Sequence, residues 1–323
     1  MTLFRLGYVA MSKHVKNASP SKTMSFAQFS KIADREAAIA KLERIAQMNL
    51  HNCLRLLRHN AAHNIAFFRL SSKLIPLANH PSLKDWAYME PLREALKEIK
   101  CFLMEHPNVR VDFHPDHFVL LNSTDTSIFK NSIQTLGMHY QLLKGMGIDP
   151  AHRCVLHVGG GYDDKEQALE QFVHNWGLVP PRIQKMVILE NDDKVFNVRD
   201  TLYLCEKLGI PFVFDYHHYL VNHTKEESIQ EEWPRIAATW GQSELPVKVH
   251  ISSPKSEADC RAHAELIDLE MFWDFVGLVK GTVAQIDVMI EAKGKDEALF
   301  QLVRDLKAHK QAEWINDSSF IPF

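Results

Sequence analysis

The chain has 323 residues, of which 46% are hydrophobic and 24% are charged, the balance of an ordinary soluble globular protein. No uninterrupted apolar run approaches the roughly 18 residues of a membrane span, and the N-terminus acquires charge too early for a signal peptide, so we expect a cytoplasmic protein without a membrane partner. The net charge of −3 does not by itself favour DNA binding, and the five scattered cysteines, with no CxxC pair, argue against disulfides or a zinc knuckle.

Short apolar runs rich in β-branched residues alternate along the chain with longer stretches of helical periodicity. The expected strands are Arg5–Ala10, Phe67–Ser72, Val109–His114, Cys154–Val158, Met186–Glu190, Phe212–Asp215, Val247–Ile251 and Ile286–Glu291. The expected helices are Glu36–Leu57, Glu90–Met104, Ser127–Lys144, Lys165–Asn175, Val198–Leu208, Ile229–Trp240, Leu269–Lys280 and Glu297–Lys307. The strands are continuously apolar, which is typical of a parallel sheet that is covered on both faces.

Eight strand–helix pairs in one chain predict an α/β protein with a single-domain (β/α)₈ TIM barrel rather than an open doubly wound sheet. Gly209-Ile210-Pro211 separates a helix from the strand that follows it, as this alternation requires. No glycine-rich phosphate motif follows the first strand, which argues against a dinucleotide-binding fold. We assign residues 1–310 to the barrel and residues 311–323 to a C-terminal tail that is packed on the barrel or loosely ordered.

The third to the eighth strand each deliver a histidine or a carboxylate near their carboxyl ends. In a barrel of this kind the loops at those ends carry the function, so we expect these side chains to meet at one rim. The groups concerned are His114 and His117, His157, Glu190 with Asn191-Asp192-Asp193 after it, Asp215 with His217 and His218, Lys248 and His250 with His263 in the following loop, and Glu291.

Carboxylates that converge without a cation repel one another and lose hydration, and divalent ions remove both difficulties. The chain has 18 histidines, and a mixture of histidine and carboxylate without thiolate suits Zn²⁺ or Mn²⁺. The number of candidate ligands exceeds the need of one ion, so we expect two or three. Several neighbouring ions are a common apparatus for in-line attack on a phosphodiester.

Lys248 lies two residues before His250 and therefore points to the same side of its strand. An ammonium group beside metal ions is unfavourable, so Lys248 is either neutral or converted by CO₂ into an anionic carbamate. A third interpretation is that Lys248 sits higher on the rim and binds phosphate. The residues alone do not decide among these interpretations.

Charge is distributed unevenly along the chain. Residues 1–75 contain twelve Lys or Arg and three Asp or Glu, a net charge of +9, which leaves −12 for the remainder. A basic segment beside an acidic remainder fits a phosphate-facing rim around a carboxylate-bearing centre. Lys13, Lys16 and Lys22 follow the first expected strand and would lie on the same rim as the metal ligands.

Six short motifs, taken with their order and spacing, resemble those of the UV damage endonuclease family, a relative of endonuclease IV. The resemblance extends from Arg5-Leu6-Gly7-Tyr8 to Met289–Lys293, and the residues beyond have no obvious match. The motifs are Phe68-Arg69-Leu70-Ser71-Ser72, His114-Pro115-Asp116-His117-Phe118, His157-Val158-Gly159-Gly160, Leu189-Glu190-Asn191-Asp192-Asp193, Phe214-Asp215-Tyr216-His217-His218 and Lys248–Lys255.

The resemblance implies three divalent ions, with Mn²⁺ favoured over Zn²⁺ or Mg²⁺, and a carboxylated Lys248. It implies a first ion held by His114, His157 and Glu190. It also implies a second ion that shares Glu190, and a third near His218 and His263. The additional ligands of the second ion would be Asp215, His250 and Glu291. Glu190, Lys248, Asp215 and Glu291 are the expected catalytic groups.

The implied reaction is hydrolysis of the phosphodiester immediately 5′ to a pyrimidine dimer or (6-4) product in duplex DNA, by a monomer. Such lesions weaken stacking and pairing, so kinking the duplex there costs less than elsewhere. His117 and Phe118 are expected to wedge into the stack, with Tyr8, Lys13 and Lys16 also contacting DNA. The family usually has Gln at the position of His117 and tends to have Asn where this chain has Met11 and Ser12.

Three other functions are compatible with parts of the pattern. A sugar isomerase or epimerase on the same barrel would also use carboxylates and histidines around divalent ions, but it has no use for a basic first loop. An abasic-site endonuclease would share the metal ions but not the carboxylated lysine. A damage-binding protein without catalysis would not need so many charged groups around metal ions.

Overall fold

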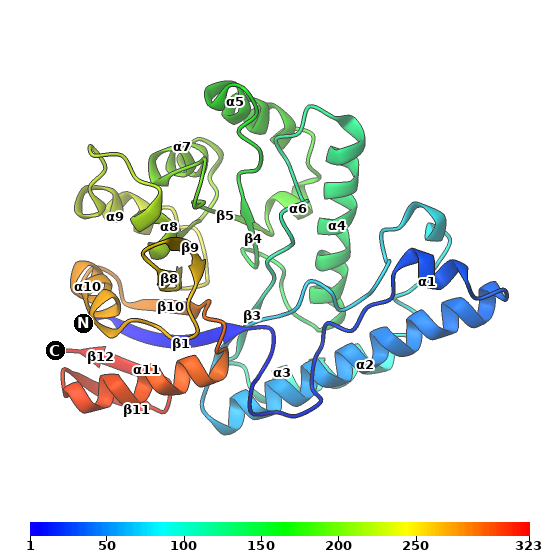
Figure 1. The fold of residues 1–323 in the computed structure, drawn as a ribbon, viewed down its shortest axis with the longest axis horizontal. Helices are drawn as coiled ribbons and strands as arrows, with labels where there is room; N and C mark the ends of the chain where they lie inside the picture. Colours follow the sequence, from blue (N-terminus) through cyan, green and yellow to red (C-terminus); the bar gives the residue numbers. More distant parts are fainter.

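The computed structural model describes residues 1–323 and has a barrel of parallel strands surrounded by helices (Figure 1). Every predicted barrel strand is present; β2 to β5 are one to three residues shorter than expected, and the other four have the expected length or one residue more. The predicted (β/α)₈ barrel is confirmed. Its eight strands are β1 (Leu3–Val9), β2 (Phe67–Arg69), β3 (Arg110–Asp112), β4 (Cys154–His157), β5 (Val187–Glu190), β6 (Phe212–Asp215), β7 (Val247–Ile251) and β10 (Gln285–Ile290).

The strands pair in the order expected for a closed barrel. β2 pairs with both β1 and β3, and β1 continues through β10, β7, β6 and β5 to β4, all in parallel. A single parallel bridge between Phe113 and Cys154 joins β3 to β4, so the barrel is nearly closed and this seam is its least paired one. Because all eight strands run the same way, their carboxyl ends share one mouth.

Side-chain caps satisfy the first backbone N–H groups of several helices, among them α2 and α7. The Asp34 carboxylate accepts from the N–H groups of Glu36 and Ala37 at the start of α2, and Gly209, with φ 67°, ends α7 in the left-handed conformation. None of the helices has the length and apolar composition that a bilayer span requires. The helices are α1 (Phe26–Ser30), α2 (Arg35–Ala62), α3 (Arg93–Glu105), α4 (Thr126–Gly145), α5 (Lys165–Trp176), α6 (Pro181–Gln184), α7 (Val198–Leu208), α8 (Tyr216–Val221), α9 (Ile229–Ala238), α10 (Leu269–Val279) and α11 (Asp296–His309), with a 3₁₀ turn at Pro81–Leu83.

Inside the barrel, an apolar layer lies between two layers of charged side chains, one at the mouth around Glu190 and one around Asp287. Val9, Phe67 and Met289 form a small buried cluster of their own, separate from the main core outside the sheet. Gly7 permits this arrangement, because a Cβ there would lie 2.1 Å from the backbone oxygen of Phe67. Asp287 lies two residues before Met289 on β10, on the side of the apolar layer away from the mouth. It forms ion pairs with Arg5 and Arg110.

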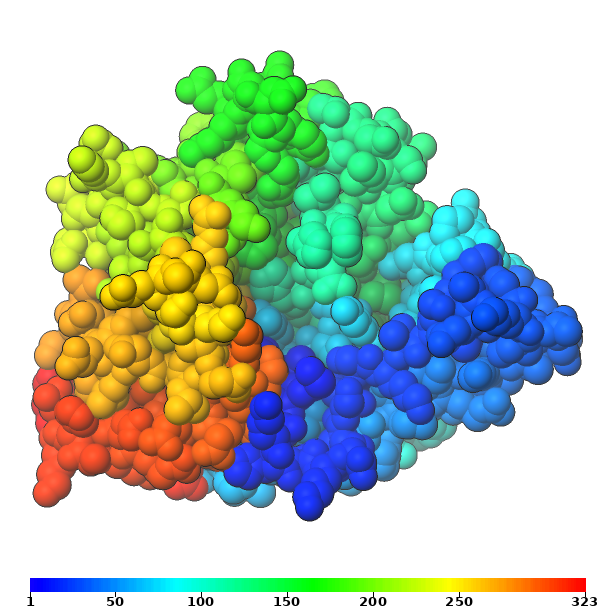
Figure 2. Space-filling view, in the orientation of Figure 1, coloured from blue at the N-terminus to red at the C-terminus, as the bar shows by residue number.

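Two hairpins complete the fold. β8 (Pro254–Ser256) and β9 (Asp259–His263) form an antiparallel hairpin after β7, and in Figure 2 this hairpin and the loop after β1 border a hollowed part of the surface. The segment expected as a tail instead forms β11 (Ala312–Asn316) and β12 (Ser319–Pro322). β12 pairs antiparallel with β1, and Phe320 stacks on Phe4 with ring centroids 5.3 Å apart, so this segment is an ordered part of the barrel.

Candidate metal centre at the barrel mouth

Glu190, the last residue of β5, is the hub of the charged side chains at the mouth. Its Oε2 lies 2.9 Å from His114 Nε2 and 3.9 Å from His157 Nε2, while its Oε1 lies 2.9 Å from His250 Nδ1. Glu190 and His250 are fully buried, whereas His114 and His157 are half-buried. One carboxylate therefore contacts histidines from three different strand ends, as the sequence predicted.

Two further carboxylates join this hub. Asp215 ends β6, and its Oδ2 lies 3.7 Å from His218 Nδ1. Glu291 follows β10, and its Oε1 lies 3.1 Å from His250 Nδ1. In two sets of residues, the potential ligand atoms all lie within 4.8 Å of one another: His114, His157 and Glu190 form one set, and Glu190, Asp215 and His250 form the other. The two sets share Glu190, as the resemblance implied for the first two ions.

Backbone carbonyls fix the ring orientation of three of the histidines. The Nδ1 atoms of His114, His218 and His263 lie 3.1, 2.9 and 2.6 Å from the carbonyl oxygens of Pro115, Asn191 and Glu291. A carbonyl can only accept, so Nδ1 of each ring donates to it, and Nε2 is the nitrogen that a metal ion could use. This arrangement is typical of histidines that bind metals through Nε2.

Several buried polar atoms at the mouth have no protein partner, and divalent cations would satisfy them. Asp215 Oδ2, His250 Nε2 and His157 Nδ1 are buried without a hydrogen bond. Burial raises the pKa of Asp215 well above its ordinary value, and the nearby charges of Glu190 and Glu291 act in the same direction. Burial also lowers the pKa of His250 to about 4. A neutral His250 can bind a cation through Nε2, and a cation would also stabilise the buried charge of Asp215. The residues present therefore suit divalent metals.

His217 and His218 are neighbours in sequence with different surroundings. His218 lies 3.6 Å from Glu190 Oε1 through Nδ1, and its ring centroid is 6.4 Å from that of His263. Both ring nitrogens of His217 are occupied, Nδ1 by Ser252 Oγ at 2.6 Å and Nε2 by the Cys260 carbonyl at 2.7 Å. His217 therefore anchors the β8–β9 hairpin and has no nitrogen free for a metal.

Lys248 lies one layer below the histidines, facing Asp112. Its Nζ is 3.2 Å from Asp112 Oδ2, and both side chains are fully buried. Burial lowers the pKa of Lys248 to about 8, although Asp112 acts in the opposite direction. Asp112 was absent from the residues singled out in the sequence. The signal that could have found it is its position two residues before His114, on the same face of the strand.

Arg69 is a second residue that the sequence reasoning passed over as a site residue. It is the last residue of β2, and its Nη1 forms an ion pair with Glu291 Oε1. Burial would raise the pKa of Glu291, but the charge of Arg69, followed by that of His250, holds it well below its usual range. A cation therefore already contacts one of the expected metal ligands.

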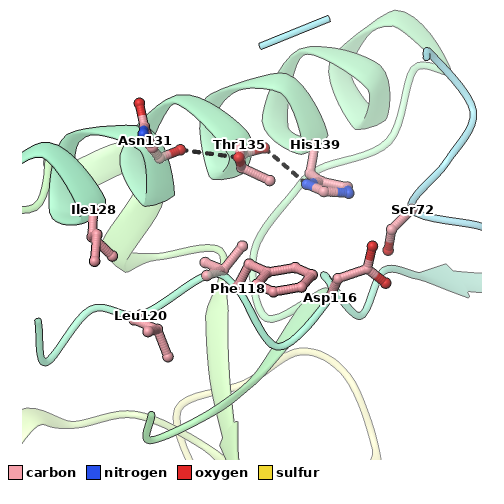
Figure 3. A pocket seen from close by; sticks show the side chains of 9 residues that line it. Ser72, Asp116, Phe118, Leu120, Ile128, Asn131, Thr135 and His139 are labelled. Atoms are coloured by element: carbon pink, nitrogen blue, oxygen red, sulfur yellow. Dashed lines mark hydrogen bonds between the residues drawn. The ribbon is translucent and has the colours of Figure 1, made fainter. Parts of the chain in front are cut away.

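The loop after β3 presents the two residues expected to probe DNA. His117 and Phe118 are exposed, with ring centroids 4.1 Å apart, and the Phe118 side chain is 74% exposed. A cavity of about 430 Å³ lies between Phe118 and the α4 residues Ile128, Asn131, Thr135 and His139 (Figure 3). A second hollow, of about 420 Å³, includes His117 and His157 in its lining, so it adjoins the metal centre.

The other expected DNA contacts differ in their placement. Lys13 and Lys16 are exposed in the loop after β1. Tyr8 is fully buried, its hydroxyl donates to Asn60 Oδ1 at 2.6 Å, and its ring makes an edge contact with Phe68. Side chains alternate along β1, so Tyr8 faces α2 while Val9 faces the barrel interior. Tyr8 is thus a core residue, and its side chain has no surface for a DNA contact.

The proteins that this chain resembles in sequence are UV damage endonucleases. The family model described as UV-endonuclease UvdE matches residues 4–323, including the C-terminal hairpin, where the motifs had given no match. A protein of Halalkalibacterium halodurans named UV DNA damage endonuclease is 52% identical over 316 residues, which cover 98% of each chain. A Bacillus cereus protein of the same name is 42% identical over 306 residues, 95% of each chain.

Solved structures agree with these sequence matches. The crystal structure of SacUVDE has a TM-score of 0.82 and 31% identity, covering 95% of this chain and 99% of that one. Endonuclease IV from Thermus thermophilus has a TM-score of 0.55 at 13% identity, which shows a shared fold alone.

Proposed function

Because the chain belongs to the UV-endonuclease UvdE family, we propose that it cleaves duplex DNA at the phosphodiester immediately 5′ to UV photoproducts and leaves a 3′-hydroxyl. The relatives' name supplies the class of reaction, an endonuclease acting on UV-damaged DNA. The cleavage position, and cyclobutane dimers and (6-4) products as the lesions, belong to the proposal. So does action as a monomer.

One observation carries the proposal: histidines and carboxylates from β3, β4, β5, β6, β7 and β10 converge on Glu190 at one mouth. A site that only bound DNA would gain nothing from buried carboxylates, because they repel phosphate. The same groups, held at this spacing, suit the metal-assisted hydrolysis of a phosphodiester.

We assign three divalent ions, with Mn²⁺ favoured, to this centre. His114, His157 and Glu190 would hold the first, Glu190 with Asp215, His250 and Glu291 the second, and His218 with His263 the third. When bound, such ions supply a nucleophile near neutral pH and stabilise charge on the phosphate and the leaving oxygen. Glu190 orients the histidines on both of its sides, and the carbonyls that accept from Nδ1 of His114, His218 and His263 leave Nε2 of these rings for a metal ion.

We further propose that Lys248 is carboxylated. The buried layer around it contains four cations, Lys248, Arg110, Arg153 and Arg5, but only two carboxylates, Asp112 and Asp287. Conversion of the ammonium into a carbamate would leave three cations facing three anions, which removes the imbalance around the fully buried Lys248 and Asp112. Native mass spectrometry would show a CO₂ adduct that the Lys248→Met variant lacks. An unmodified wild-type mass after equilibration with bicarbonate would contradict this assignment.

Damage recognition is assigned to His117 and Phe118. Both are exposed, and His117 lines the hollow that adjoins His157, so a wedge at this point would hold the distorted step next to the candidate metal centre. Lys13 and Lys16 would contact phosphates from the loop after β1.

The proposed function is tested by incubating the purified protein with UV-irradiated and untreated plasmid in Mn²⁺. We expect nicking of the irradiated plasmid only. Duplexes with one defined dimer map the cut, which should fall directly 5′ to it. Equal nicking of both plasmids, or a preference for an abasic duplex over a dimer duplex, would reject the proposal.

A further inference from the structure

A second cluster of charges lies beside Glu291, outside the set of expected metal ligands. Arg69 reaches Glu291 from β2, and Lys295 follows Glu291 by four residues, in the turn between β10 and α11. Burial lowers the pKa of Lys295, and the positive charges of Arg69 and Lys13 lower it further, so both cations lie within electrostatic range of Lys295. Glu291 and Glu265 are the carboxylates whose charges act in the opposite direction on Lys295.

Most N–H donors of the Arg69 guanidinium make no hydrogen bond to protein. Its guanidinium carries five N–H donors, and its only side-chain hydrogen bond to protein is the one from Nη1 to Glu291. The side chain is 18% exposed, and none of its nitrogens is among the buried atoms that lack a partner. Arg5 offers a contrast, because its Nε and Nη2 bind both oxygens of Asp287 at 2.7 and 2.8 Å. The single contact of Arg69 leaves its other N–H donors without a protein partner and, because none of them is a buried unpaired atom, accessible to a ligand.

The turn that carries Lys295 is tightly constructed. Lys295 has φ 57° and ψ −127°, a backbone conformation that a residue with a side chain rarely adopts. Gly294 permits the turn, since a Cβ there would lie 2.4 Å from the carbonyl oxygen of Glu265. The Lys293 N–H donates to the Ala264 carbonyl at 2.9 Å, so the turn is tied to the loop that bears His263.

Hydrogen bonds to Asp296 hold the loop after β1 beside the turn that carries Lys295. The Lys13 N–H donates to Asp296 Oδ1 at 2.7 Å, and the Ser12 hydroxyl donates to the other oxygen of this buried carboxylate. Asp296 is the residue after Lys295, so one carboxylate holds Lys13 beside the turn. Segments from the two ends of the chain thus place Lys13 beside the turn of Lys295, near the Arg69–Glu291 ion pair.

Glu291 and Glu265 offset two of these three positive charges, so an anion that reached the free donors of Arg69 would still be bound favourably. We propose that Arg69, Lys295 and Lys13 form a binding site for a backbone phosphate of the DNA, next to the metal centre. This inference rests on the proposed function and adds a site to it. The guanidinium would contact Glu291 and the phosphate together, and so fix the DNA relative to an expected metal ligand. Arginine can donate to both groups at once, whereas lysine is a point charge.

The test is the salt dependence of DNA binding, measured in a Glu190→Gln background to prevent nicking. Arg69→Gln and Lys295→Gln should each reduce the slope of log Kobs against log[salt] by about 0.9 in magnitude, the contribution of one phosphate contact. Arg69→Lys should keep the slope but lower the nicking rate about tenfold in the wild-type background, because it keeps the charge and loses the second contact. The manganese content of each variant should match that of its parent.

Lys307→Gln is the matched control, since Lys307 lies near the far end of α11 beside Trp314. Its slope should equal that of the parent. Unchanged slopes for both Arg69→Gln and Lys295→Gln, while the wild-type protein binds and nicks irradiated DNA, would overturn this inference alone. A wild-type protein that neither binds nor nicks irradiated DNA would overturn the proposed function as well.

Discussion

His250 and Glu190 are 60 residues apart in the chain, yet Nδ1 of the first lies 2.9 Å from Oε1 of the second. Both are buried, and His250 Nε2 is left without a protein partner. β6 separates their strands in the barrel, so the contact exists only because the sheet curves and directs both side chains inward.

Glu190→Gln should abolish nicking and leave the fold intact. The amide has nearly the same shape, but it cannot provide the negative charge that two sets of ligands share. We expect the nicking rate to fall by about 1000-fold or more, with reduced manganese content and an unchanged circular dichroism spectrum. Glu94→Gln, on the exposed face of α3, serves as the control. A mutant that nicks at the wild-type rate would refute the metal cluster.

Chelation should remove both activity and stability. On the proposed assignment, cations satisfy the buried carboxylates and the histidines, so the metal-free protein should unfold at a lower temperature. At a metal concentration of 100 times Kd, each site contributes about 2.7 kcal/mol. Elemental analysis before and after chelation gives the metal identity and count, and added Mn²⁺ should restore nicking. Full activity after exhaustive chelation would show that nicking does not require bound metal ions.

His117→Ala and Phe118→Ala should weaken discrimination between damaged and intact DNA more than they slow chemistry. Loss of a stacking side chain costs about 1–3 kcal/mol of binding free energy. Affinities for a dimer duplex and an undamaged duplex, measured together, give the ratio that should fall. Met104→Ala removes a side chain of similar exposure from α3 and should leave the ratio unchanged. An equal loss on both duplexes would exclude a probing role.

His217→Ala should loosen the β8–β9 hairpin. His217 fills a buried position and uses both nitrogens to hold Ser252 and the Cys260 carbonyl, so its removal leaves these groups unpaired at a cost of about 1–3 kcal/mol. Hydrogen exchange should become faster over Pro254–His263 and remain unchanged in β12. Undiminished protection of the hairpin would show that other contacts hold it.

Phe320→Ala should destabilise the protein by about 3–5 kcal/mol, because Phe320 is fully buried against Phe4, Phe272 and Trp314. Phe323→Ala is its control, since Phe323 is largely exposed and should change stability by less than about 0.5 kcal/mol. Chemical denaturation measures both. Equal, small effects would mean that the C-terminal hairpin contributes little to the barrel.

The order of strands and helices could be predicted because it depends on local patterns. Continuous apolar runs gave the eight barrel strands, and the histidines and carboxylates at their ends gave the members of the metal centre. Helices α1, α6 and α8 were missed because each is shorter than the window that reveals helical periodicity. The hairpin β11–β12 was missed because its strand β12 pairs with β1, more than 300 positions away in sequence.

By itself, the sequence determined which chemical groups gather at the carboxyl ends of the strands, because strand direction and side-chain alternation are local properties. Only the tertiary structure decided the partners of Lys248, Arg69 and Tyr8. Asp112 lies opposite Lys248, Glu291 meets Arg69, and Asn60 binds Tyr8 in the core. These contacts depend on the curvature and register of the whole barrel, which are set by packing between distant segments and leave no trace in any short stretch of sequence.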